Sequence, residues 1–282
     1  MQQFAALPQD PFMQLLGVDF SSAPSRRKPI TLALGRRERH VLRLEGLLSF
    51  DTLPALGDWL AQPGPWLGGF DFPFGLPREL VVSLGWPLEW PALMLHYAAM
   101  SRAEIRERFK AFCDARPVGA KFAHRACDSV SGAHPSMKWV NPPVAWMLHA
   151  GMPLLQRAGV HLPGLQSGDE SRVALEAYPG LLARELIGRR SYKSDDARKQ
   201  TAERFIARKD LIDALEQGRS RLGLRLKLSH GQRDELAADA SGDRLDAVLC
   251  LMQAAWAADQ PGYGLPADFD PLEGWVTTAE QA

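Results

Sequence analysis

Apolar and polar residues alternate in short runs near the start of the chain, and this pattern predicts β-strands. The runs cover Leu15–Phe20, Ile30–Gly35 and His40–Gly46, and short polar turns separate them. Short turns between successive strands favour an antiparallel meander. Residues 1–13, which come before these strands, are expected to form a loose leader.

The pattern then changes to the three- and four-residue spacing of an amphipathic helix, over Asp51–Gln62. A fourth apolar strand begins at Trp66, reaches an acid at Asp71 and is stopped by prolines. From Ser83 to about Gly168 the chain is rich in Trp, Pro and His, with one clear helix over Arg102–Ala115. This stretch is predicted to be a helical or irregular insertion.

Strand character returns at Val173–Gly180, and Pro179 is expected to begin a helix that runs to Ile187. Further helices are predicted over Asp195–Gln217 and Gly242–Ala257, because apolar side chains recur there on one face. The predicted class is α/β: a mixed sheet, with three antiparallel strands followed by parallel strands, flanked by helices.

Length and composition agree with a single folded unit. The chain has 282 residues, of which 46% are hydrophobic, and this is enough for one large α/β domain. We expect residues 1–282 to form one domain that contains the insertion at 83–168. No apolar run is long enough to span a membrane, and the three cysteines form no zinc-binding or disulfide pattern. A soluble cytoplasmic protein with reduced thiols is expected; the oligomeric state stays open.

Charge is balanced overall but not along the chain. Lys plus Arg and Asp plus Glu each number 33, which argues against a protein that coats long nucleic acids. Residues 184–233 hold 14 basic and 7 acidic residues, whereas residues 234–282 hold 10 acidic residues and one basic residue. This asymmetry predicts a basic rim around an acidic centre.

Carboxylates interrupt or end the apolar elements. They are Asp19, Asp71, Glu176, Asp243 and Asp246. A buried carboxylate is costly without a partner, so each of these positions calls for an explanation. The last two acids lie three residues apart and therefore share one face of their helix.

Acids that meet repel one another, and their pKa values rise unless a cation neutralises them. Mg²⁺ and Mn²⁺ prefer such oxygen ligands, and two ions roughly 3.5–4 Å apart can promote phosphodiester hydrolysis. We therefore predict a Mg²⁺ or Mn²⁺ site formed by Asp19, Asp71, Asp243 and Asp246. Glu176 is expected to complete or tune this catalytic group.

Four residues are candidates for contact with a substrate phosphate. Ser21 and Ser22 follow the first strand, where hydroxyl or backbone N–H groups could donate hydrogen bonds, although turn-forming bonds are the ordinary alternative. Lys193 lies in a basic loop and could hold a phosphate, and Arg125 belongs to a polar stretch of the insertion.

Four motifs occur in an order that resembles the domain-of-unknown-function family 429, whose members are predicted nucleases with a ribonuclease H-like fold. The motifs are GVDFSSAP, GGFDFPFGLP, ALEAYPG and SGDRLDAVLC, and the resemblance covers about residues 15–257. The spacing of Asp243 and Asp246 in the last motif is also similar to that in the C-terminal helix of Holliday-junction resolvases of the same superfamily.

The resemblance implies that Asp19, Asp71 and Glu176 lie on the first, fourth and fifth strands, and that Asp243 and Asp246 lie on a final helix. The long insertion and the acid on the fifth strand depart from the simplest ribonuclease H pattern. The set of acids that binds metal therefore stays open at this point.

The leading hypothesis is a metal-dependent nuclease or phosphodiesterase that uses two metal ions on a nucleic-acid or nucleotide-like substrate. An ATP-dependent phosphotransferase of the actin-like type is an alternative, because such proteins also begin with a strand that ends in Asp and hydroxyl residues. A non-catalytic binding or scaffold protein with the same fold is another.

Overall fold

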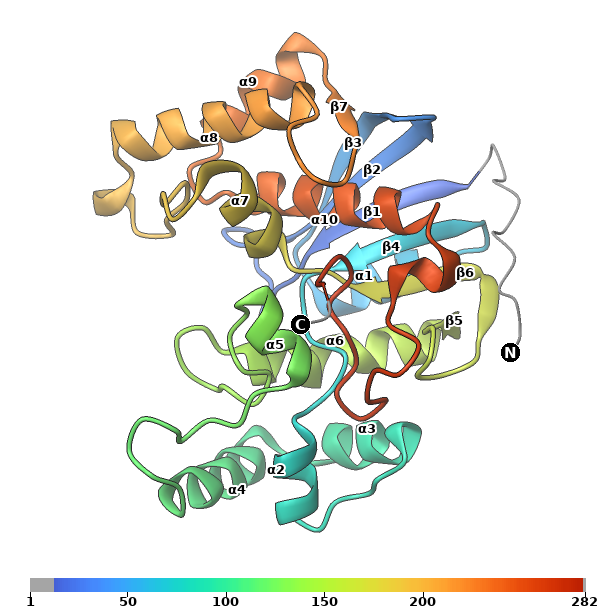
Figure 1. Ribbon diagram of the computed structural model, residues 1–282, viewed down its shortest axis with the longest axis vertical. Coiled ribbons are helices and arrows are strands. Elements are labelled where there is room, and N and C mark those ends of the chain that lie inside the picture. The colour runs from blue at the N-terminus through green and yellow to red at the C-terminus, as the bar shows by residue number, and fades with distance from the viewer. Residues whose placement is uncertain (1–12, 281–282) are drawn as a thin grey trace.

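Within residues 13–280, seven strands form one mixed sheet, in the order β5-β6-β4-β1-β2-β3-β7 (Figure 1). The computed structural model describes residues 13–280, so nearly all of the predicted leader lies outside the described residues. The strands are β1 (Gln14–Asp19), β2 (Ile30–Glu38), β3 (Val41–Phe50), β4 (Trp66–Phe70), β5 (Val160–His161), β6 (Asp169–Glu176) and β7 (Arg225–Lys227).

Strand directions confirm the predicted α/β class. β1, β2 and β3 are antiparallel neighbours, β4 and β6 run parallel to β1, and β5 runs parallel to β6. The short strand β7 adds to the far edge, parallel to β3. The carboxyl ends of β1, β4 and β6 therefore meet at the same edge of the sheet, and the acids predicted on these strands are carried to that edge.

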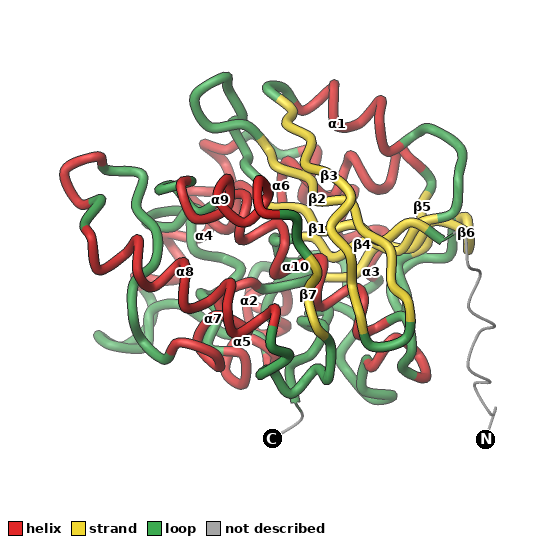
Figure 2. The backbone as a smooth tube through the Cα atoms, turned by 90° about the horizontal axis from the view of Figure 1, so that it is seen from above, coloured by secondary structure: helices red, strands yellow, loops and turns green. Residues whose placement is uncertain are grey.

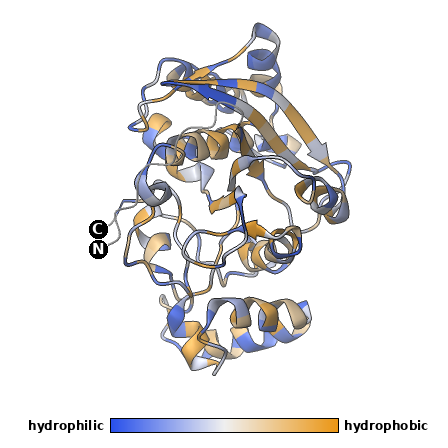
Figure 3. Cartoon of the chain, turned by 90° about the vertical axis from the view of Figure 1, so that its right-hand side faces the viewer, coloured by the Kyte–Doolittle hydropathy of each residue, from blue (hydrophilic) through white to orange (hydrophobic). Residues whose placement is uncertain are grey.

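Helices cover both faces of the sheet (Figure 2). They are α1 (Leu53–Leu60), α2 (Arg78–Ser83), α3 (Trp90–Ala99), α4 (Arg102–Asp114), α5 (Ala126–Ser131), α6 (Val144–Ala158), α7 (Pro179–Ile187), α8 (Ala202–Glu216), α9 (His230–Ala238) and α10 (Asp243–Ala257), with short 3-10 helices at Ala197–Lys199 and Pro261–Gly264. Hydrophobic and hydrophilic stretches alternate along single helices, as expected where one side of a helix is buried (Figure 3).

Each face of the sheet has its own hydrophobic core, because side chains alternate between the faces along a strand. Leu16 and Val18 of β1 belong to one core, which also contains Phe109 of α4 and Leu154 of α6. Leu15 of β1 packs in the other core, among residues of helices α7 to α10. The fold is thus a three-layer arrangement with the sheet in the middle.

The insertion at 83–168 belongs to the first of these cores. It contributes helices α3 to α6, and its last part forms β5, which joins the sheet edge. Most of its buried apolar side chains belong to the same core as Leu16 and Val18 of β1. α2, α3 and α4 lie at the bottom of Figure 1, on the opposite side of the molecule from α8 and α9.

Helix α10 lies very close to the centre of the sheet, where it contacts β1, β2 and β4. A Cβ atom added at Gly17 of β1 would overlap the backbone of Ala247 and Leu251 in α10. One added at Gly69 of β4 would approach the carbonyl oxygen of Cys250 to 2.7 Å. Glycine at these two positions is therefore what permits the helix to rest on the strands.

Several element boundaries differ from the prediction. β3 extends to Phe50, beyond the predicted end at Gly46. The predicted helix from Asp195 begins instead at Ala202, because residues 195–201 form a 3-10 turn and an N-terminal boundary. All three cysteines are buried and free, as expected. Between residues 13 and 280, no helix has the length and apolar character needed to cross a membrane.

Candidate functional site

Asp19 and Asp71 lie side by side at the ends of neighbouring parallel strands. Val18 of β1 pairs in register with Phe70 of β4, so the two acids that follow are level with each other. The Asp71 N–H donates to the Val18 carbonyl oxygen at 2.9 Å, which continues the strand pairing to the acid itself. Both side chains are half-buried.

Helix α10 brings the other two acids to the same place, because its N-terminal end lies over this edge of the sheet. Asp246 is fully buried, and Asp243 is half-buried. The Tyr192 hydroxyl donates to one carboxylate oxygen of Asp246, and the Lys193 ammonium forms an ion pair with the other. We call Asp19, Asp71, Asp243, Asp246 and Lys193 the acidic centre.

Electrostatics show that these carboxylates act on one another. Removal from water raises the pKa of Asp19 well above its usual value, and the charges of Asp246, Asp243 and Asp71 raise it further, against the opposing effect of Lys193. Removal from water also raises the pKa of Asp71 to about 7, while Lys193 lowers it and Asp246 raises it. The charge of Asp246 therefore adds to the effect of burial at both Asp19 and Asp71.

Glu176 is placed on the other face of the sheet. It pairs in register with Phe70, whose side chain lies in the core opposite α10, so its carboxylate points away from Asp71. Its oxygens accept hydrogen bonds from Arg125 at 2.6 and 2.8 Å and from the Phe74 N–H at 2.8 Å. Its charge still raises the pKa of Asp71, but it does not join the acidic centre.

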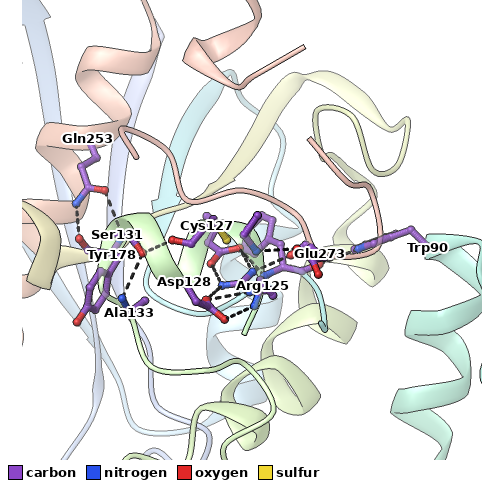
Figure 4. Close-up of polar contacts among 12 residues, drawn as sticks. Trp90, Arg125, Cys127, Asp128, Ser131, Ala133, Tyr178, Gln253 and Glu273 are labelled. Atoms are coloured by element: carbon purple, nitrogen blue, oxygen red, sulfur yellow. Dashed lines mark hydrogen bonds and ion pairs between the residues drawn. The ribbon is translucent and has the colours of Figure 1, made fainter. Parts of the chain in front are cut away.

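Arg125 is a correction to the sequence prediction, which gave it a place at the substrate. Its side chain is 2% exposed and binds Glu176, Asp128 and the carbonyl oxygen of Glu273 (Figure 4). The guanidinium donates to Asp128 at 2.8 Å. Arg125 therefore ties the insertion to β6 and to the segment near the C-terminus, and no substrate reaches it in this arrangement.

Ser21 and Ser22 lie just beyond Asp19 and are partly exposed. The Ser21 hydroxyl accepts a hydrogen bond from the Ala23 N–H at 3.3 Å, which is the turn-forming role named as the alternative. The carbonyl oxygen of Ser22 accepts from Arg102 of α4 at 3.0 Å. Both residues follow Asp19 directly along the chain, and Arg102 links this turn to the insertion.

Only part of the predicted basic rim faces the acids. Lys193 contacts Asp246, whereas Arg190 pairs with Asp210 of α8 at 2.6 Å. A further cation comes from Lys28, which pairs with Asp195 and lowers the pKa of Asp243. Burial outweighs this effect, so the pKa of Asp243 is raised.

Sequence reasoning missed Tyr192 and Lys28. Tyr192 is next to Lys193, but only the fold shows that its hydroxyl reaches Asp246 on α10. Lys28 belongs to a run of basic residues in a turn, which reads as a solvated loop from sequence alone. No local signal marks either residue, since both act on partners more than 50 positions away.

The donor chemistry of the acidic centre fits a divalent cation, because half-buried carboxylates with raised pKa values supply hard oxygen ligands. Within residues 13–280, no group of three or more His, Cys, Asp or Glu side chains is arranged to hold a metal ion. Mg²⁺ is usually bound by one or two carboxylates together with water and substrate phosphates. Asp19 and Asp71 can supply those two carboxylates.

The raised pKa of Asp71 predicts a pH dependence of stability in metal-free protein. Between the ordinary value of 3.8 and about 7, the folded state keeps a proton on Asp71 that the unfolded state has lost. The free energy of unfolding should therefore fall as pH rises through this window. We expect Asp71→Asn to flatten that decline, as measured by urea unfolding between pH 4 and 8 with EDTA present; parallel curves for both proteins would contradict the assignment.

Comparison with known proteins identified no relative. No family model matches the chain, and no match was found among the curated proteins or the solved structures.

Proposed function

We propose that this protein hydrolyses a phosphodiester in a nucleic-acid or nucleotide-like substrate, with Mg²⁺ or Mn²⁺ as cofactor. The observation that carries the proposal is the acidic centre itself. Two carboxylates at the ends of adjacent parallel strands, Asp19 and Asp71, meet a buried carboxylate from a third element, α10. Burial raises the pKa values of Asp19 and Asp71, and the charge of Asp246 raises both further. Perturbed acids of this kind are typical of functional sites.

The topology supports a ribonuclease H-like relationship, which we also propose. Three antiparallel strands are followed by parallel strands, and the sheet order β3-β2-β1-β4-β6 places the acid-bearing strands β1 and β4 together at the centre. The final helix carries Asp243 and Asp246 across them, as the resemblance to family 429 implies.

The residues of the acidic centre have different roles in the proposed reaction. Asp19 and Asp71 hold the divalent ion, which when bound would offset charge on the phosphate and lower the pKa of a water molecule. Lys193 is 43% exposed and has three N–H donors, of which Asp246 engages one, so its ammonium can also face a phosphate oxygen. In the reaction, a water oxygen bonds to phosphorus as the bond to the leaving oxygen breaks, and the leaving oxygen gains a proton.

The test is a cleavage screen over single-stranded, double-stranded and branched DNA and RNA, and over nucleotide-like diesters, with Mg²⁺, Mn²⁺ or EDTA. We expect cleavage of at least one substrate class with metal and none with EDTA. Asp19→Asn protein, purified in parallel, reports any contaminating nuclease. Equal cleavage by both proteins, or cleavage unaffected by EDTA, would refute the proposal. ATP hydrolysis without diester cleavage would favour the phosphotransferase alternative.

A further inference from the structure

Asp246 has both carboxylate oxygens engaged inside the protein. Its side chain has no exposed surface, the Tyr192 hydroxyl donates to Oδ1, and the Lys193 ammonium lies at Oδ2. A cation already neutralises this acid, which would otherwise be costly to bury. Asp246 is therefore the acid of the centre that is least in need of a metal ion.

The position of Lys193 is fixed by contacts that do not involve the acids. Gly242 has a φ of +78°, and a Cβ atom added there would lie 2.6 Å from the Lys193 Cβ. The aliphatic part of the Lys193 side chain therefore packs directly against the backbone at Gly242. The Ser194 N–H donates to the Ala240 carbonyl oxygen at 3.0 Å. Arg208 donates to the Tyr192 carbonyl oxygen at 2.8 Å and holds the preceding residue. The loop that carries Lys193 is thus held in place independently of the acids, and it positions the ammonium beside Asp246.

Asp19 and Asp71 contrast with Asp246. Among the described residues, no donor bonds to the side-chain oxygens of either acid. Lys193 acts on both only through space, by lowering their pKa values. The centre therefore contains one neutralised acid, Asp246, and two acids that stay open for a ligand, Asp19 and Asp71, while Lys28 partly offsets the charge of Asp243.

We propose that the Lys193 ammonium takes the place of the second metal ion, so that the acidic centre binds one divalent ion, at Asp19 and Asp71, where two were expected from the sequence. The inference rests on the proposed function, because it concerns the metal of that same site. It assigns Lys193 a catalytic role: its remaining N–H donors offset charge on the phosphate on the side where a second ion would otherwise stand.

The experiment measures Mn²⁺ binding to metal-free protein by isothermal titration calorimetry, without substrate. We expect one ion per wild-type chain and a second ion in Lys193→Met, in which Asp246 loses its resident cation. Lys199→Met is the matched control, since Lys199 lies on the nearby 3-10 helix and its charge acts on Asp196, which is not part of the acidic centre. It should bind one ion, as wild type does.

Asp246→Asn provides an independent measurement, which stands even if Lys193→Met does not fold. It should still bind one ion, because Asp246 is not a ligand of that ion, although the binding should weaken because the negative charge that acts on Asp19 and Asp71 is lost. Two ions in wild type, or loss of the single ion in Asp246→Asn, would overturn this inference and leave the proposed function standing. No ion in any of the proteins would instead refute the metal-dependent function.

Discussion

Asp19→Asn is expected to abolish metal-dependent hydrolysis and to weaken Mn²⁺ binding by at least about 100-fold. Loss of a group that merely supports a metal ligand costs about 10–100-fold in affinity or activity, and Asp19 is proposed as a ligand itself. Asn keeps the shape of the side chain but removes a unit of charge at the centre of the sheet, where β1 is held by β2 and β4. Calorimetric titration and single-turnover cleavage measure the two losses separately.

The fold should survive this change, because Asp19 is half-buried and carries an unfavourable charge in metal-free protein. Asp58→Asn is the matched control, since Asp58 is exposed on α1, and it should behave as wild type in both assays. Unchanged turnover in Asp19→Asn would show that the acidic centre is not the reaction site.

Arg125→Met is expected to lower the free energy of unfolding by about 3–5 kcal/mol, the largest stability effect we predict. Removing one member of a buried ion network leaves the others buried without a counter-charge. Here Glu176, 4% exposed, and Asp128, 1% exposed, would both lose the same guanidinium. Urea unfolding followed by circular dichroism provides the measurement.

Two further variants locate the origin of the loss. Arg106→Met removes an exposed arginine from α4 and should change the free energy of unfolding by no more than about 0.5 kcal/mol. Glu176→Gln combined with Arg125→Met should be less destabilised than the sum of the single changes, because the glutamine leaves no unpaired charge at that site. Strict additivity would mean that the two residues are not coupled.

Hydrophobic patterning predicted the framework of this protein because the framework is locally encoded. The alternation in β1 and β2 and the apolar face of α10 depend only on neighbouring residues. The same patterning located Asp19, Asp71 and Asp246, since each stands out against an apolar element. The structure brings all three together at one edge of the sheet.

Glu176 shows why patterning did not suffice for the whole site. It also stands out in an apolar strand, but the residue level with Asp71 is Ala177, directly after β6, because Phe70 pairs with Glu176. A shift of one residue in register turns a side chain to the opposite face of the sheet. The local sequence does not reveal the register between two strands that lie far apart along the chain. Arg125 was misjudged for the same reason, since its partner is that carboxylate.

The close packing of α10 against β1 and β4 has a consequence for how related sequences should be compared. Gly17 stands two residues before Asp19, and Gly69 stands two residues before Asp71, so each strand offers the helix first an empty position and then an acid on the same face. The unit that encodes the site is therefore Gly-x-Asp, repeated on two adjacent strands. A chain that kept every acid but replaced either glycine would hold α10 away from the sheet, and Asp246 with it. Inventories of acidic residues alone would count such a chain as intact, whereas the paired Gly-x-Asp unit would identify it as altered.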